Sequence, residues 1–229
     1  MILLWALLIV QSGFTSDEWY TVTLNPSVRY GYYHDHVEIQ GDRIIFQNHY
    51  WKHEEGFLNE EHLGGFSKND PDLTPLFFNF QSKYRATEIK IDGTVKDGKW
   101  LTVKIHKTGQ ELPIITRTIP KKIILSIFFP VWLGKTLPSM KPGQTISFTT
   151  LLEDNLEASF NPVSGRVRLE KPDDYARKTS SQKLNVNYRD QQSIWYVDKK
   201  GIPLKMDLLS SKARVDRVSK ETAERFLQE

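Results

Sequence analysis

The sequence has no cysteine among its 229 residues. This absence excludes disulfide bonds, thiolate metal sites and a cysteine nucleophile. An excess of charge of one sign is missing as well, because 31 lysines and arginines nearly balance 28 aspartates and glutamates. The longest basic groups are pairs such as Lys121-Lys122 and Lys199-Lys200. We therefore expect neither a nucleic-acid groove nor a polybasic surface that binds membranes.

Long hydrophobic runs are also missing, apart from one at the N-terminus, where Ile2 to Val10 are all apolar. Such a run is too short to span a bilayer, which requires about 20 apolar residues, but it is typical of a secretory signal. The sequence therefore predicts a signal peptide over residues 1–16, cleaved after Ser12 or Ser16. It further predicts a periplasmic or secreted protein with no transmembrane span after cleavage. An N-terminal core strand is the alternative, because no Lys or Arg precedes the run.

Most of the remaining sequence alternates apolar and polar residues in short runs, which indicates antiparallel β-strands. Gly41-Asp42 and Asp97-Gly98 are typical of tight hairpin turns. The polar stretch Lys52 to Pro75 has no clear periodicity and is interpreted as a long connection. The runs that we interpret as strands cover residues 18–24, 28–39, 43–51, 86–96, 99–107, 111–119, 144–153, 156–161, 165–170, 182–190, 193–198 and 202–210.

Two segments are predicted to be helical. Lys121 to Leu133 is the most apolar stretch after the N-terminus, and the preceding Pro120 suits a first helical position. We expect a helix there that Pro130 kinks or ends, with a buried strand as the alternative. A short C-terminal helix is predicted over Val218 to Gln228, with Ser219 as its N-cap.

Three local motifs resemble a group of secreted bacterial domains of unknown function. They are Glu18-Trp19-Tyr20 followed by Gly31-Tyr32 and His34, the segment Leu137 to Phe148, and the hairpin Trp195 to Met206 (WYVDKKGIPLKM). The group is similar to the lipoprotein-carrier (LolA/LolB-like) fold. The resemblance implies a mainly β fold, a single strongly curved antiparallel sheet of about 10–12 strands that forms a half-barrel around one apolar helix and a cavity. Residues 17–229 would then be a single β half-barrel domain.

Polar residues in the sequence predict neither catalysis nor a cofactor. His34, His36 and Glu38 share one face of a predicted strand, which makes them weak candidates for a Zn²⁺ or Fe²⁺ site. A solvent-facing polar row explains the same pattern, so no metal site is predicted. A second polar group is interpreted as part of a solvated loop and consists of His49, His53, Glu60, Glu61 and His62.

Aromatic residues carry the functional prediction. A helix that is apolar on all sides must be enclosed in a core or lie beside a ligand cavity. The residues predicted to line a pocket for an acyl chain or another apolar ligand are Phe77, Phe78, Phe80, Phe128, Phe129 and Trp132. Ordinary packing under the sheet is the alternative for the same residues.

The predicted function is therefore that of an exported binding protein for an apolar ligand, with a lipid or a lipidated protein as its partner. Two other classes of function stay open. One is an envelope protein that docks a protein partner. The other is an enzyme without a cofactor, since a half-barrel of related shape serves a cofactor-free enzyme of violacein biosynthesis. The sequence does not indicate an oligomeric state.

Overall fold

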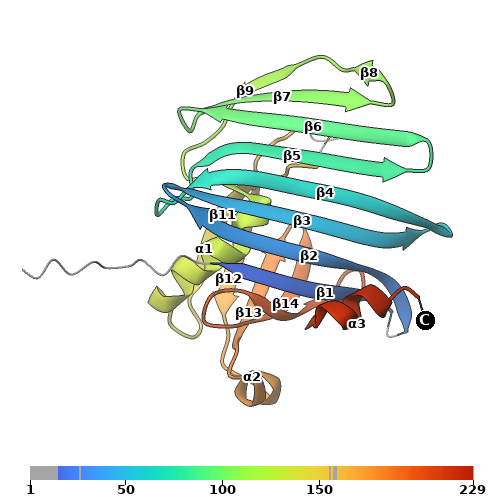
Figure 1. Ribbon diagram of the computed structural model, residues 1–229. Coiled ribbons are helices and arrows are strands. Elements are labelled where there is room, and N and C mark those ends of the chain that lie inside the picture. Colours follow the sequence, from blue (N-terminus) through green and yellow to red (C-terminus); the bar gives the residue numbers. More distant parts are fainter. Residues whose placement is uncertain (1–14, 26, 155, 157–158, 229) are drawn as a thin grey trace, which may run out of the picture.

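The structure is a computed structural model that describes residues 15–25, 27–154, 156 and 159–228. Its dominant feature is one strongly curved, 16-stranded sheet that wraps around the helix α1 (Phe129–Thr136) (Figure 1). The prediction of a mainly β half-barrel around one helix is confirmed. The predicted signal peptide, residues 1–16, lies outside the described residues except for Thr15 and Ser16.

The elements have the following bounds. The strands are β1 (Ser16–Leu24), β2 (Val28–Gln40), β3 (Arg43–Glu54), β4 (Phe57–Lys68), β5 (Pro75–Tyr84), β6 (Thr87–Lys96), β7 (Trp100–Lys107), β8 (Gln110–Glu111), β9 (Ile115–Thr118), β10 (Ile124–Leu125), β11 (Thr145–Leu151), β12 (Val163–Leu169), β13 (Gln182–Tyr188), β14 (Gln191–Val197), β15 (Pro203–Leu208) and β16 (Ala213–Val218). The helices besides α1 are η1 (Ser126–Phe128), η2 (Leu137–Ser139), α2 (Asp174–Thr179) and α3 (Lys220–Arg225). Among the described residues, no helix is long and apolar enough to cross a membrane.

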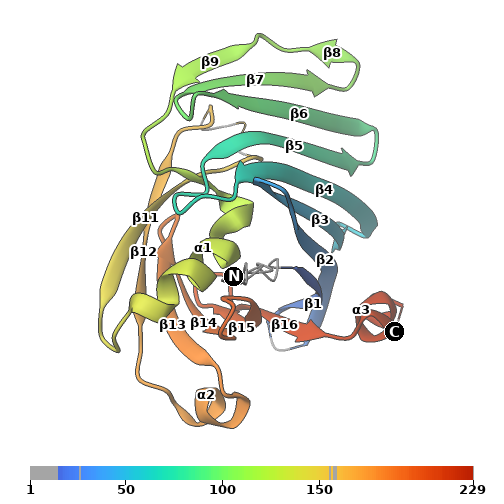
Figure 2. The same ribbon diagram turned by 60° about the vertical axis from the view of Figure 1, so that its left-hand side comes forward.

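Strands that follow one another in the chain mostly pair as antiparallel neighbours. The spatial order runs from β10 and β11 through β16 to β1, and on to β7 and β8, with β9 also paired to β7. The pairing of β1 with β16 therefore places the first and last of these strands side by side in the middle of the sheet. The pair β10–β11 is parallel, so the sheet is mixed. Figure 2 shows α1 enclosed between β11–β13 on one side and β2–β4 on the other.

The sheet has more strands than the predicted 10–12, partly because the stretch Lys52 to Pro75 is not a long loop. Half of it is β4, its first three residues end β3, and β5 begins at its last residue. The neighbour β3 pairs with β4 along its whole length in one register. Apolar and polar residues do not alternate along β4, because its outer face carries polar residues and its inner face includes Gly65 and Ser67. Tertiary pairing with β3 and β5 overrides the weak local preference.

The central helix begins later than predicted. Ile124-Leu125 form the short strand β10, Ser126 to Phe128 form the 3₁₀ helix η1, and α1 begins only at Phe129. The predicted helix start after Pro120 is therefore wrong. Pro130 lies in the first turn of α1, where its missing N–H breaks no helical hydrogen bond, so it begins the helix rather than kinking or ending it.

Three further segments test the sequence predictions. The predicted strand 156–161 is wrong, because its described residues include turns and the fully buried Phe160 has a φ of 58°. The helix α2 was not predicted, although Asp173 caps it by accepting a hydrogen bond from the Ala176 N–H at 2.9 Å. The C-terminal helix is confirmed as α3, and Ser219 accepts from the Thr222 N–H at 3.3 Å as its N-cap.

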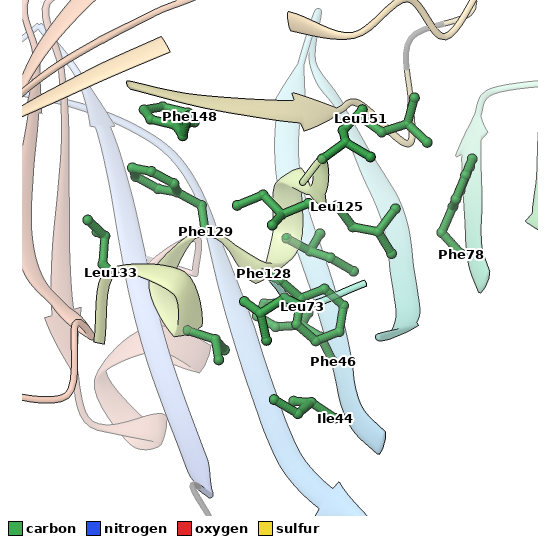
Figure 3. Packing of buried hydrophobic residues seen from close by; sticks show 14 of the residues in the cluster. Ile44, Phe46, Leu73, Phe78, Leu125, Phe128, Phe129, Leu133, Phe148 and Leu151 are labelled. Carbon is green, nitrogen blue, oxygen red and sulfur yellow. The ribbon is translucent and has the colours of Figure 1, made fainter. Parts of the chain in front are cut away.

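The core lies on the concave face of the sheet in two clusters. The larger surrounds the helix, and Figure 3 shows Phe46, Phe128 and Leu133 packed within it. The smaller cluster consists of Tyr20, Val22, Met206 and Val215. Trp195 packs against both clusters and lies between them.

Two glycines fix the position of α1 against the β14–β15 hairpin. A Cβ atom at Gly134 would lie 2.1 Å from the Lys200 carbonyl oxygen, so only glycine permits this approach. Gly201 has a φ of +81° and lies against the backbone of Gly134. The Asp198 side chain accepts hydrogen bonds from the N–H groups of Lys200 and Ile202 at 2.8 and 3.0 Å, which holds the turn in this form. The terminal hairpin motif therefore anchors the helix.

Candidate functional site

A cavity of about 370 Å³ lies on the concave face, where the start of the helical segment meets the sheet. Its walls come from β2–β4 on one side and from β13–β15 on the other. The residues that define it include Tyr33, Asp35, Phe46, Asn48, Leu63, Ile127, Phe129, Val186, Trp195, Met206 and Leu208. Small-molecule pockets usually have volumes of about 300–1,000 Å³, so this cavity can hold one small ligand.

The apolar walls of the cavity belong to both core clusters. Phe129 from α1 meets the Trp195 ring edge to face at a centroid distance of 5.3 Å. Phe129 also packs against Phe148 at 4.5 Å, which fixes its ring from behind. Met206 and Leu208 close the opposite side, where the smaller cluster begins. The cavity therefore lies between the two core clusters, and α1 does not fill it.

Three exposed polar residues mark the side of the cavity that faces solvent. Asp154 follows β11, while Arg189 and Gln191 flank the β13–β14 turn, and all three line the cavity. A ligand with an apolar chain and a polar head would place its head among these groups, because burying a polar head without partners is costly.

One carboxyl group lies inside the cavity. Asp35 on β2 accepts a hydrogen bond from the Asn48 side chain on β3 at 2.6 Å. Desolvation raises the pKa of Asp35 to about 7, and the hydrogen bond from Asn48 opposes this rise only in part. The nearby carboxylate of Glu18 raises the pKa further.

A second buried carboxyl group positions the helix start at the cavity. Glu153 is fully buried and accepts hydrogen bonds from the Ser126 hydroxyl at 2.5 Å and from the Ile127 N–H at 3.3 Å. Both donors belong to η1, whose first N–H groups have no partner within the helix. Burial raises the pKa of Glu153 to about 7, with the two hydrogen bonds acting against it. Glu153 therefore ties the end of β11 to the helical segment.

The structure separates the six predicted pocket residues into different environments. Phe129 lines the cavity. Phe78 and Phe128 are fully buried core residues, with Phe128 in edge contact with Phe46 at 5.9 Å. Phe80 is partly buried and packs against the same core. Phe78 and Phe128 therefore pack as ordinary core residues, which was the alternative to a role in the pocket.

The two remaining predicted residues lie away from the cavity. Trp132 is partly buried and packs behind Phe129, with a centroid distance of 5.6 Å. Phe77 is directly opposite Phe66 in the β4–β5 pair, and the two rings stack at 5.1 Å. Because side chains alternate along a strand, Phe77 projects to the outer face while Phe78 projects inward. The structure therefore does not bring these aromatic residues together around one ligand site.

Sequence reasoning missed the cavity residues Asp35 and Asn48. The sequence did contain a signal for Asp35. Because side chains alternate along a strand, Asp35 projects from the same inner face of β2 as Tyr33 and Val37. Asn48 is its direct partner on β3. A carboxyl group on an inner, otherwise apolar strand face is the unusual feature that points to a cavity.

The weak metal candidates lie on the outer face of β2. Asp17 on β1 joins His34 and His36, with its Oδ1 atom 2.6 Å from His34 Nε2 and 3.2 Å from His36 Nδ1. Glu38 lies farther along the strand, and its Oε2 atom is 3.9 Å from His36 Nε2. The histidine hydrogen bonds to Asp17 lower the pKa of Asp17. The structure therefore brings His34 and His36 together around Asp17 rather than around Glu38.

Comparisons with known proteins give little information about this chain. No protein-family model matches the sequence, and no curated protein matches it. One solved structure that the comparison matches to this chain is that of a DUF1089 family protein from Pseudomonas aeruginosa, determined at 1.80 Å resolution. It is 16% identical, with a TM-score of 0.42, and the match covers 75% of this chain and 87% of that one. Similarity at this level carries no argument about function.

Proposed function

We propose that the protein binds an apolar ligand with a single flexible chain, such as a fatty acyl group, in the concave cavity. The observation that carries the proposal is a cavity of about 370 Å³ with mostly apolar walls that the protein's own helix leaves unfilled. The cavity opens to solvent beside Asp154, Arg189 and Gln191, so an apolar chain can enter it from the surface. Phe129 and Trp195 supply flat apolar surfaces, and Arg189 and Gln191 at the solvent side supply polar partners for a head group.

Affinity is expected to increase with chain length. Burial of each methylene contributes about 0.8 kcal/mol, so a chain that is shorter by two methylenes should bind roughly tenfold more weakly. The test is displacement of cis-parinaric acid, a fluorescent fatty acid, by decanoate and by dodecanoate. A ligand bound only through its head group would show no dependence on chain length.

A matched pair of variants locates the binding site. Leu63 lines the cavity from the inner face of β4, whereas Leu58 on the same strand is 59% exposed and lies on the outer face. Leu63→Trp should fill the cavity and reduce binding of cis-parinaric acid at least tenfold, while Leu58→Trp should leave binding unchanged. Equal binding by both folded variants would contradict the proposal.

A second pair tests the opposite wall. Leu208 on β15 lines the cavity, and its neighbour Leu209 is 49% exposed. Leu208→Trp should reduce binding as Leu63→Trp does, and Leu209→Trp should not. Circular dichroism of each variant shows whether the fold is retained, so that loss of binding is separated from loss of structure.

Export and kinship with lipoprotein carriers remain part of the proposal. The apolar run Ile2 to Val10 supports a signal peptide, and the three sequence motifs support the kinship. The intact mass of the protein recovered from outside the cytoplasm tests the first point. A mass that begins at Gly13 or at Asp17 is expected, and an uncleaved N-terminus would contradict the predicted cleavage.

A further inference from the structure

The outer face of the sheet carries a row of three histidines on adjacent strands. His34 on β2 lies directly opposite His49 on β3, and His49 lies directly opposite His62 on β4. Glu60 precedes His62 by two residues and therefore projects from the same face of β4. This arrangement is hidden in the sequence, because β4 is not recognisable as a strand there.

Three of these side chains converge on one point. His49 Nε2 is 2.5 Å from Glu60 Oε1, and His62 Nε2 is 3.4 Å from the same oxygen. The two imidazole rings are tilted by 36° relative to one another, with their centroids 3.7 Å apart. One ligand atom from each residue lies within 4.8 Å of the others. Donors around a tetrahedral Zn²⁺ ion lie about 3.3 Å apart, as Zn–N distances of about 2.0–2.1 Å require. The His62–Glu60 distance of 3.4 Å already matches this spacing, and His49 lies closer to the same oxygen.

The frame that carries these residues is rigid. The two strands β3 and β4 pair over twelve residues each without a shift in register. The Trp51 ring packs on His49 at a centroid distance of 3.6 Å and restricts its rotation.

Open space adjoins the three side chains. A cavity of about 620 Å³ on this face is lined by residues that include His36, Gln47, His49, His62 and Asn79. It extends to Gly64, which follows His62 by two residues and has the Asn79 side chain lying against it. A metal ion held by three protein groups here would keep a coordination position open to solvent, as sites with two histidines and one glutamate commonly do.

We propose that His49, Glu60 and His62 form a binding site for a divalent transition-metal ion, Zn²⁺ above all, with an open coordination position toward the cavity beside Gly64. Imidazole and carboxylate donors suit Zn²⁺ better than Mg²⁺ or Ca²⁺, which prefer oxygen ligands alone. The site lies on the opposite face of the sheet from the apolar cavity and does not depend on the proposed ligand.

Isothermal titration calorimetry of the untagged protein with ZnCl₂ tests this proposal. We expect one Zn²⁺ ion per chain, and no heat of binding with MgCl₂ at the same concentration. His62→Asn and Glu60→Gln should each weaken Zn²⁺ binding at least about tenfold, since each removes a ligand. Binding of Co²⁺ in place of Zn²⁺ should give visible absorption bands that His62→Asn abolishes.

His36→Asn tests the neighbouring group around Asp17. The matched control is His106→Asn, because His106 on β7 lies outside the proposed site and does not line the cavity. It should bind Zn²⁺ as the unmodified protein does. The absence of Zn²⁺ binding, or unchanged affinity in both His62→Asn and Glu60→Gln, would overturn the proposal. Loss of binding in His36→Asn alone would also overturn it, because the ion would then be held by the group around Asp17.

Discussion

Replacing Asp35 by Asn should make the protein more stable above pH 7 and leave it unchanged near pH 4. The carboxyl group of Asp35 has a pKa of about 7 in the folded protein, against an ordinary value of 3.8. A raised pKa means that the folded state binds the proton more tightly than the unfolded state. The contribution of Asp35 to stability is therefore complete below pH 4 and is lost as the pH rises to 7.

The size of the effect follows from the difference between the two pKa values. One pKa unit corresponds to about 1.4 kcal/mol, so a difference of about three units sets an upper limit of about 4 kcal/mol. Water that reaches Asp35 through the cavity reduces this value, and we expect about 2–4 kcal/mol. In Asp35→Asn the amide oxygen still accepts the hydrogen bond from Asn48, so packing and hydrogen bonding are conserved.

Urea unfolding of both proteins at several pH values between 4 and 8 measures this effect. The free energy of unfolding of the unmodified protein should fall relative to that of Asp35→Asn between pH 4 and 7, and the difference should then stay constant. If the two proteins keep the same difference in stability at every pH, the carboxyl group does not lie in an apolar environment. The description of the cavity would then be wrong.

Three further substitutions test other parts of the account. Glu153→Gln should also remove a loss of stability between pH 4.5 and 7, of about 3 kcal/mol at most, because burial raises the pKa of Glu153 to about 7. The same urea series measures this effect, and a difference in unfolding free energy that does not change with pH would contradict the assignment. Phe128→Ala should lower the unfolding free energy by about 3–5 kcal/mol, whereas Phe77→Ala on the outer face should lower it clearly less. Equal losses would refute the placement of Phe128 in the core and Phe77 on the outer face. Gly134→Ala should lower the unfolding free energy by about 1–3 kcal/mol, because the added methyl group pushes α1 away from the β14–β15 turn. An unchanged melting temperature would contradict the prediction.

Hairpin turns were the part of the fold that the sequence predicted best. Asp97 and Gly98 both have positive φ angles, at 56° and 61°, and they connect β6 to β7 as predicted. Gly41 likewise begins the turn between β2 and β3. Such turns depend on backbone conformations that few residues adopt, so local sequence determines them.

The strand β4 could not be predicted because its stability comes from pairing with neighbours rather than from its own pattern. Gly64 and Gly65 weaken its β propensity. Gly65 nevertheless has a packing role, since a Cβ atom there would lie 2.9 Å from the end of the Ile127 side chain in the segment leading into α1. The error concealed His62 as a partner of His49, and with it the proposed metal site.

For the apolar site, the sequence predicted the kind of residue but not the position of the gap. Phe128 and Phe129 are adjacent and equally apolar, yet only Phe129 lines the cavity. Whether an aromatic ring fills the core or borders a cavity depends on what the opposite strands place against it. That information is in the packing of Trp195 and Met206, which lie far along the chain.

The most direct test of the central claim is a methyl NMR titration with dodecanoate, using protein labelled at Ile, Leu and Val methyl groups. We predict saturable shifts at Leu63, Ile127, Val186 and Leu208, all of which line the cavity, and none at Leu58 or Leu209 on the surface. Shifts confined to surface methyl groups, or no saturable shifts at the cavity methyl groups, would contradict the claim that the concave cavity binds an apolar chain.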